Sequence, residues 1–336
     1  MRKDEIMSKP CRICGQNKIF SSLVSKDFFL GSKEEYGYVF CPICNSLSIE
    51  DIPGDLSDLY KNYYSFSPPS PISWLKFQIY KYIISKLNFI SKFFCSILQN
   101  QEDLPIKSIE PIKIQKNSRI LDVGCGSGTL LCLLDKMGFN NCIGIDPYLE
   151  KDINYSTGLS IKKQDFFDLN EKFDLIMFHH VFEHFSNPKD VIKQVHKLLS
   201  KNGICIIRIP DVDSYSFSRY KENWFSIHAP FHLFLPSKNA MEMLVKDTGL
   251  IIEDIIGEQL IEFFFYSMGH ELGIADYEKY GNRKFIEEHG IKSIPPFHIK
   301  NELKDAKQRL KQVRKYNLCD WSIYYLKKEE SNEVPH

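Results

Sequence analysis

The sequence predicts an α/β protein built around a doubly wound, largely parallel sheet. The main observation is that short apolar runs alternate with helical stretches from residue 119 onward, which is typical of β–α units that form such a sheet. The first run leads into a glycine-rich turn that opens a helix, a conformation that lets backbone approach a ligand. The length of 336 residues leaves room for one large domain and a small accessory module.

Composition is that of an ordinary globular protein, with 43% apolar and 26% charged residues, which excludes wholesale disorder. Basic and acidic residues both number 43, so the formal net charge is zero. A dedicated nucleic-acid binder would carry a basic excess. The chain starts without the apolar core of a secretory signal, and no run of 18 uncharged apolar residues indicates a membrane span. We therefore expect a cytoplasmic protein that binds no nucleic acid.

The first element is a pair of cysteine turns within residues 1–50. Four of the ten cysteines stand in two C-x-x-C pairs, and the other six are scattered singly. Four thiolates on two tight turns form a tetrahedral set for Zn²⁺, and an all-cysteine set is typical of a structural site. Two disulfides are disfavoured in a reducing compartment. The sequence therefore predicts a small zinc module of the knuckle or ribbon type, with ligands Cys11, Cys14, Cys41 and Cys44.

Residues 51–115 form the second element, a linker rich in proline and serine followed by a lysine-rich helix at 74–98. Two interpretations of this helix are open. It packs on the large domain with its lysines reaching into water, or it lies in a membrane interface. The first is favoured, because the lysines are spread around the axis and leave no strongly polar face.

The large domain is expected over residues 116–258 together with 319–328. Residues 259–318, which interrupt it, are mostly helical by pattern and form a helical insertion. The last run, 319–328, has the composition of a strand and is expected to close the sheet as an antiparallel member. Strands are expected within 119–125, 142–146, 161–167, 173–181, 203–210 and 250–257, and helices at 129–138, 188–200 and 238–248.

A nucleoside-binding turn is the clearest local motif. The first strand carries Asp122 and runs into Gly124, Gly126 and Gly128, and Asp146 ends the next strand. An acid at that place can accept both hydroxyls of a ribose, while the helix that follows the turn offers free N–H groups to an anion. The third glycine comes one position earlier than in dinucleotide sites. A ligand with an adenosine, an amino group and a carboxylate fits better than a dinucleotide.

The run LDVGCGSG at residues 121–128 resembles the first motif of the class I S-adenosylmethionine-dependent methyltransferases. The resemblance covers residues 118–258 and implies a Rossmann-like sheet of seven strands that binds S-adenosylmethionine. It also implies that Asp165 and Phe166, which follow the third strand, contact the adenine. The cysteine pairs together with LYKNYYS at residues 59–65 resemble methyltransferases of sugar and polysaccharide modification that carry an N-terminal zinc module.

Candidate catalytic residues follow the fourth strand, where His180, Glu183 and His184 stand close together. An imidazole titrates near neutral pH and can take a proton from a hydroxyl or an activated carbon, and a carboxylate can orient it. Glu183-His184 resembles the Glu-His pair of a subgroup that includes ubiquinone-type O-methyltransferases. The alternative is that His184 only caps a helix or supports the loop.

A second group follows the fifth strand and includes aromatic, acidic and imidazole side chains suited to a polyhydroxylated or carbonyl-bearing acceptor. Its members are Asp211, Tyr215, Trp224, His228 and His232. Of these, we expect His232 to take part in catalysis.

The sequence thus favours a methyltransferase acting on an oxygen or carbon of a small molecule, a sugar or nucleotide-linked sugar first of all. An RNA base methyltransferase with a zinc module is a second hypothesis. It is disfavoured because the loop after the fourth strand reads His-His-Val-Phe rather than Asn/Asp-Pro-Pro-aromatic. A catalytically inert zinc-bearing interaction protein is the third.

Overall fold

The structure is a computed structural model that describes residues 2–5, 10–16, 20–29, 32, 34–54, 105–259, 261–271, 313 and 317–330. The chain divides into two compact units. The first unit comprises residues 1–56 and 170–336, and the second comprises residues 57–169. The lysine-rich helix expected at 74–98 and most of the insertion expected at 259–318 lie outside the described residues. Within the described part, no helix is long and apolar enough to cross a membrane.

The second unit is built on short parallel strands. The first two lie within the predicted ranges 119–125 and 142–146, whereas the third, expected within 161–167, spans only residues 160–162. Its strand order is β5-β6-β8-β7, in which β5, β6 and β8 run parallel and β7 pairs antiparallel with β8. Every residue of β5 is buried, including Asp122, which stands among its apolar residues. Its elements are η3 (Pro105–Ser108), β5 (Ile120–Val123), α4 (Thr129–Lys136), β6 (Cys142–Ile145), β7 (Ile153–Asn154), β8 (Ser160–Lys162) and η4 (Phe166–Asp168).

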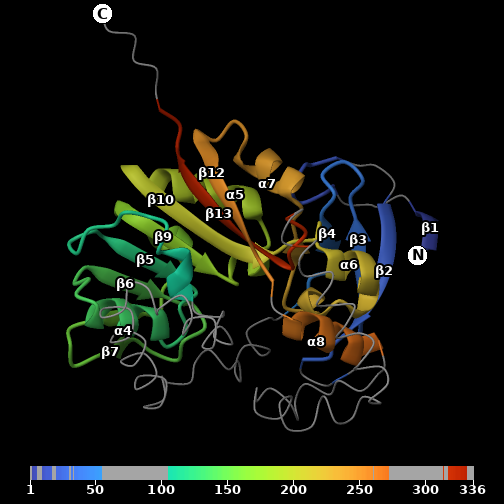
Figure 1. Cartoon of the computed structure of the whole chain (residues 1–336), viewed down its shortest axis with the longest axis horizontal. Helices are drawn as coiled ribbons and strands as arrows, with labels where there is room; N and C mark the ends of the chain where they lie inside the picture. Colours follow the sequence, from blue (N-terminus) through green and yellow to red (C-terminus); the bar gives the residue numbers. More distant parts are fainter. Residues whose placement is uncertain are drawn as a thin grey trace, which may run out of the picture. The chain divides into compact units, whose positions relative to one another are not determined.

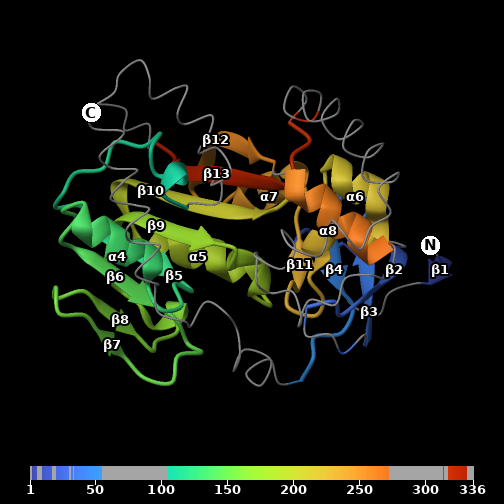
Figure 2. The same ribbon diagram turned by 60° about the horizontal axis from the view of Figure 1, so that its bottom comes forward.

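The first unit contains four longer strands in the order β12-β13-β10-β9 (Figures 1 and 2). β9 and β10 are parallel, whereas β13 is antiparallel to both of its neighbours, β10 and β12. The last strand of the chain is therefore antiparallel as expected, but it lies between β10 and β12 instead of closing the sheet. The elements are β9 (Phe173–His179), η5 (Phe182–His184), α5 (Pro188–Leu198), β10 (Leu199–Pro210), α7 (Lys238–Val245), β12 (Leu250–Glu258) and β13 (Trp321–Lys328).

These strands and helices confirm the predicted α/β fold with a mixed sheet. The described residues of this sheet form eight strands, whereas the sequence resemblance implied seven. The extra strand is the two-residue β7, which forms a hairpin with β8 that the sequence pattern does not predict.

The N-terminal segment forms a separate antiparallel sheet within the first unit, in the order β1-β2-β3-β4-β11. Its last strand does not belong to the N-terminal segment, because β11 comes from residues 234–235 and pairs with β4. The strands are β1 (Arg2–Glu5), β2 (Phe20–Lys26), β3 (Glu35–Phe40), β4 (Leu47–Ile49) and β11 (Phe234–Leu235).

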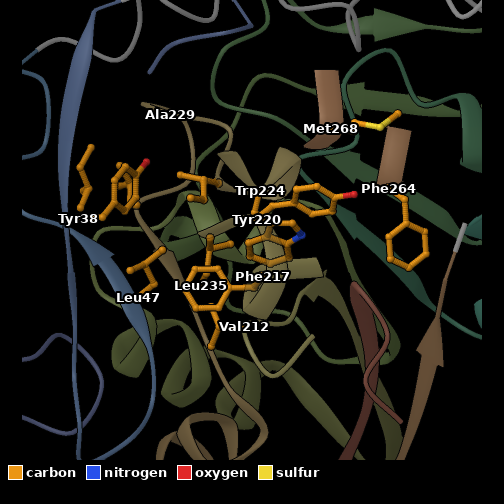
Figure 3. Packing of buried hydrophobic residues seen from close by; sticks show 13 residues of the cluster. Tyr38, Leu47, Val212, Phe217, Tyr220, Trp224, Ala229, Leu235, Phe264 and Met268 are labelled. Atoms are coloured by element: carbon orange, nitrogen blue, oxygen red, sulfur yellow. The ribbon is translucent and has the colours of Figure 1, made fainter. Parts of the chain in front are cut away.

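One apolar core joins this sheet to the residues that follow β10 (Figure 3). Tyr38 and Leu47 of the sheet pack in it with Trp224 and Leu235, all at most 1% exposed. Helices α6 (Tyr215–Tyr220) and α8 (Ile261–Glu271) also contribute side chains. Two short 3-10 turns, η6 (Lys221–Asn223) and η7 (Phe225–Ile227), follow α6 along the chain.

Candidate active site

The glycine turn after β5 has a backbone that only glycine adopts readily. Gly124, Gly126 and Gly128 have φ angles of 64°, 53° and 79°, in the left-handed region where a Cβ atom is strained. Space is also limiting at Gly128, because a Cβ there would lie 2.6 Å from Cδ1 of Ile161. The turn therefore exposes backbone where a side chain would otherwise stand.

Asp146 braces this turn from the end of β6. Its side chain is buried, and its Oδ2 accepts a hydrogen bond from the backbone N–H of Gly126 at 3.1 Å. Oδ1 accepts another from the backbone N–H of Tyr148 at 2.9 Å. Burial raises the pKa of Asp146, and the two N–H donors oppose that rise.

Glu183 is the centre of a second polar group, which lies in the first unit. Its side chain is fully buried, and within the described residues neither carboxyl oxygen has a hydrogen-bond partner. Oε1 lies 3.5 Å from Nδ1 of His180 and 3.7 Å from Nε2 of His232. A buried carboxyl without a full hydrogen bond is costly, and such groups are concentrated at functional sites.

His232 is held in a defined orientation. Its Nδ1–H donates to the carbonyl oxygen of Ser226 at 2.8 Å, which leaves Nε2 as the unprotonated nitrogen of the neutral ring. This Nε2 also lies 3.4 Å from Nδ1 of His228. The ring of His184 stands edge-on to that of His232, with centroids 5.1 Å apart. The structure thus brings together all four predicted catalytic residues, His180, Glu183, His184 and His232, and adds His228.

Burial sets the protonation of this Glu–His cluster. It raises the pKa of Glu183 to about 8 and lowers the pKa of His232 to about 4, and it lowers the pKa of His180 well below its usual value. Arg208 opposes the rise at Glu183. At neutral pH the carboxyl is therefore largely protonated and the imidazoles are uncharged. A neutral imidazole is the form that accepts a proton.

Two further features of the cluster are not signalled by the sequence. His180 and His228 have φ angles of 55° and 46°, a strained conformation that functional sites often maintain. The ring of His180 packs 4.1 Å from that of Trp321 of β13, and Arg208 lies over the same indole at 4.6 Å while it pairs with Glu258.

The four cysteines of the N-terminal segment come together as predicted. The sulfurs of Cys11 and Cys44 are 3.6 Å apart, as are those of Cys14 and Cys41, and all four lie within 4.8 Å of one another. Tetrahedral zinc with Zn–S bonds of about 2.3 Å places its sulfurs about 3.8 Å apart. The donor set therefore fits Zn²⁺.

The two cysteine turns are built alike. The backbone N–H of Gly15 donates to Cys11 O, and that of Asn45 donates to Cys41 O, both at 2.8 Å. Gly15 and Asn45 are both left-handed, with φ angles of 72° and 57°. Asn45 replaces the usual glycine of the second knuckle without loss of geometry, because asparagine tolerates this conformation better than other residues with a side chain.

Comparison with known proteins places these observations in a family. A model described as a methyltransferase domain matches residues 98–254. An uncharacterized protein of Methanocaldococcus jannaschii is 30% identical over 151 residues, which are 41% of this chain and 70% of that protein. The chain belongs to the class I S-adenosylmethionine-dependent methyltransferases.

Other relatives of this methyltransferase match over shorter stretches. The ubiquinone biosynthesis O-methyltransferase of Pelagibacter ubique is 30% identical over 115 residues, 32% of this chain and 47% of that enzyme. The match to these curated O-methyltransferases thus spans less than half of their length. Among solved structures, the cyclopropane synthase MmaA2 of Mycobacterium tuberculosis has 16% identity and a TM-score of 0.41, covering 68% of this chain and 87% of that one.

The glycine turn of the methyltransferase fits S-adenosylmethionine. Asp122 is 4% exposed, and burial together with the nearby Asp146 raises its pKa to about 8. A cationic ligand group beside it would reverse this shift, and S-adenosylmethionine carries an ammonium and a sulfonium.

The two residues expected to contact adenine differ in exposure, because Asp165 is exposed and Phe166 is buried. Asp165 is exposed, and its Oδ1 accepts the backbone N–H of Phe167 at 2.8 Å. Phe166 is only 2% exposed, whereas Phe167 is 44% exposed. Contact of Asp165 and Phe166 with adenine stays a prediction. Of the two phenylalanine rings, that of Phe167 is the more accessible, although the sequence motif does not point to Phe167.

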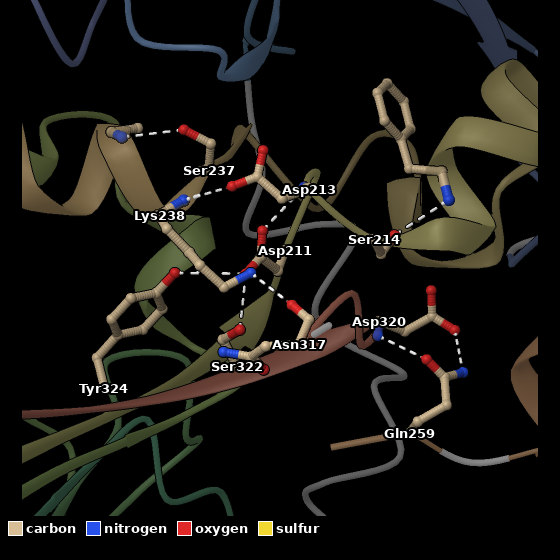
Figure 4. Close-up of polar contacts among 12 residues, drawn as sticks. Asp211, Asp213, Ser214, Ser237, Lys238, Gln259, Asn317, Asp320, Ser322 and Tyr324 are labelled. Atoms are coloured by element: carbon tan, nitrogen blue, oxygen red, sulfur yellow. Dashed lines mark hydrogen bonds and ion pairs between the residues drawn. The ribbon is translucent and has the colours of Figure 1, made fainter. Parts of the chain in front are cut away.

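Two members of the second sequence group, Asp211 and Trp224, have polar contacts within the core, and Figure 4 shows those of Asp211. Asp211 is fully buried and pairs with Nζ of Lys238 at 2.9 Å, and it accepts a hydrogen bond from Ser322 at 2.6 Å. Trp224 is 1% exposed and its indole N–H donates to Asp320 at 3.1 Å. The polar atoms of Asp211 and Trp224 are engaged within the core, and their contact with the acceptor stays a prediction. Only His228 and His232 of that group reach the cluster.

Proposed function

We propose that this methyltransferase transfers a methyl group to an oxygen or carbon of a small molecule, with a sugar or nucleotide-linked sugar as the leading acceptor class. The observation that carries the proposal is the buried Glu183 carboxyl between His180 and His232. Methyl transfer to a hydroxyl or an acidic carbon requires that the acceptor lose a proton. The similarity to ubiquinone O-methyltransferases over about 115 residues supports a hydroxyl acceptor.

The roles follow from the protonation of the cluster. Bound S-adenosylmethionine supplies an electrophilic methyl group on its sulfonium. Nε2 of His232 takes the proton of the acceptor, because Nδ1–H is already committed to Ser226 O. Glu183, whose carboxyl is already protonated at neutral pH, and His180 orient the acceptor, and the proton that His232 has taken passes to solvent after transfer. His184, whose nitrogens lie at the edge of the same cluster, is the alternative base.

For the cofactor, we propose that Asp146 accepts the ribose hydroxyls and Asp122 faces the ammonium group. Gly124, Gly126 and Gly128 provide the backbone cradle. The four cysteines hold a structural Zn²⁺. We place the protein in the cytoplasm, because all nine described cysteines are unpaired by disulfides.

The acceptor is tested with methyl-labelled S-adenosylmethionine and a panel that contains UDP-glucose, dTDP-glucose, a catechol and unmodified tRNA. Product mass identifies the acceptor and the label. We expect transfer to a nucleotide-linked sugar and none to tRNA. Transfer to tRNA alone would favour an RNA base methyltransferase, and cofactor binding without transfer to any acceptor would favour an inert interaction protein.

The base is tested by comparing His232→Ala and His184→Ala. We expect His232→Ala to lower kcat by about 10²–10⁴-fold, the usual contribution of a general base, with the affinity for S-adenosylmethionine unchanged. His196→Ala, on α5 away from the cluster, is the control. A larger loss in His184→Ala than in His232→Ala would assign the base to His184.

A further inference from the structure

The N-terminal sheet is hydrogen-bonded to the segment that carries His232. Strand β4 pairs with β11, and the backbone N–H of Ile49 donates to Leu233 O at 3.0 Å. The N–H of Leu233 in turn donates to Glu183 O at 2.9 Å. A path of backbone hydrogen bonds therefore leads from β4 through Leu233 to the buried carboxyl residue of the Glu–His cluster.

Among the described hydrogen bonds, Tyr38 of β3 makes the side-chain contact from the N-terminal sheet to His232. Its hydroxyl donates to the carbonyl oxygen of His232 at 3.0 Å, across 194 positions of sequence. Tyr38 is fully buried, and its ring belongs to the core shared by the N-terminal sheet and residues 212–235 (Figure 3). Both partners are inside the protein, so neither has water as a ready alternative.

His232 is consequently fixed at two points. Tyr38 holds its backbone carbonyl and Ser226 O holds its Nδ1–H. With both contacts in place, Nε2 stands 3.7 Å from Oε1 of Glu183 and 3.4 Å from Nδ1 of His228. A displacement of a reacting group by about 1 Å can cost about 10²-fold in rate, so the anchor of this residue matters for transfer.

We infer that Tyr38 is a positioning residue of the acceptor site, which acts through the backbone of His232 to hold this imidazole in a single tautomer beside Glu183. The inference rests on the proposed role of the Glu–His cluster. In this inference the N-terminal sheet takes part in methyl transfer, because it holds a residue of the acceptor site in position.

The test is Tyr38→Phe in the full-length protein, which keeps the buried ring and removes only the hydroxyl. Histidine labelled with ¹⁵N reports the tautomer of each ring by NMR, and the signals of His232 are assigned by their loss in His232→Asn. We expect a single Nδ1–H tautomer in the native protein and a mixture in Tyr38→Phe. Tyr36→Phe is the matched control, because the hydroxyl of Tyr36 on the same strand donates to Glu34 at the surface, and it should leave the His232 signals unchanged.

Activity provides a second readout with whichever acceptor of the panel is methylated. Tyr38→Phe should lower kcat/KM for that acceptor by about 10–100-fold, leave the affinity for S-adenosylmethionine unchanged and remain folded at the assay temperature. A folded Tyr38→Phe protein with an unaltered His232 tautomer would overturn the inference. Full activity in His232→Asn would instead refute the proposed function, whatever the tautomer in Tyr38→Phe.

Discussion

Single residues decide the chemistry of this methyltransferase through their surroundings rather than their type. Asp146 and Glu183 are both buried carboxyls, yet Asp146 has two backbone N–H groups directed at its oxygens, whereas neither oxygen of Glu183 has a hydrogen-bond partner within the described residues. Such donors favour the charged form. Asp146 is thus suited to accept hydroxyl hydrogens, whereas Glu183, with its pKa raised to about 8, is suited to hold and release a proton near neutral pH.

The role of Asp146 in cofactor binding is tested by Asp146→Ala. Loss of charge-assisted hydrogen bonds of about 1.5–3 kcal/mol should weaken S-adenosylmethionine binding by one to two orders of magnitude. Calorimetric titration measures the affinity. Asp190→Ala, which changes a half-exposed residue on α5 that pairs with Lys193, is the control and should bind normally. Unchanged affinity in Asp146→Ala would remove Asp146 from the site.

The protonation of Glu183 predicts a pH-dependent stability. Its pKa rises from 4.5 to about 8 on folding, so its contribution is complete below pH 4.5 and is lost as the pH rises toward 8. Within that window the free energy of unfolding should fall by up to about 1.4 kcal/mol per pH unit relative to Glu183→Gln. Urea unfolding of both proteins at pH 5 and pH 8 measures this difference, in which the titration of His180 and His232 largely cancels. Parallel pH profiles for the two proteins would show that Glu183 is ionised at neutral pH.

At the scale of elements, local motifs were predictable and long-range partners were not. Gly126 and Asp146 lie 20 residues apart on one β–α–β unit, and their hydrogen bond joins two parts of a short stretch of sequence. The core partners of Asp211 and Trp224 could not be predicted, because Lys238 and Asp320 lie 27 and 96 positions away. The sequence around a polar residue in a loop after a strand does not show whether a distant residue will pair with it.

The glycine turn is tested by a pair of alanine substitutions. Gly128 and Gly158 both have positive φ angles, of 79° and 95°, so each alanine incurs backbone strain of about 1–2 kcal/mol. Only at Gly128 would the new Cβ also meet Ile161, at 2.6 Å, whereas nothing lies within 4 Å at Gly158. Denaturant unfolding should therefore show a larger loss of stability for Gly128→Ala than for Gly158→Ala, and equal losses would mean that Ile161 moves aside freely.

At the scale of the whole molecule, the clustering of the four cysteines was predictable from their spacing alone. The contacts that join the N-terminal sheet to residues beyond position 200 were not. Strand β11 has two residues and no strand signal of its own, although it completes the N-terminal sheet. Two further contacts tie the second cysteine turn to α7. Ser237 Oγ donates to Cys44 O at 2.5 Å, and Asn239 donates to Ile43 O at 3.1 Å. Loss of the proposed zinc ion should therefore destabilise the structure beyond residue 50 as well.

Zinc content and its removal test this expectation. We expect about one zinc per chain by elemental analysis, and we expect Cys41→Ser/Cys44→Ser to lose it, because two ligands cannot hold the ion in a closed site. Hydrogen exchange in this double variant should rise at β11 and around Trp224 as well as in β3 and β4, since these segments share one core. Cys142→Ser, which alters a cysteine of β6 outside the cluster, should keep its zinc. Faster exchange confined to residues 10–54 would show that the N-terminal segment folds by itself, and retention of zinc in the double variant would place the metal elsewhere.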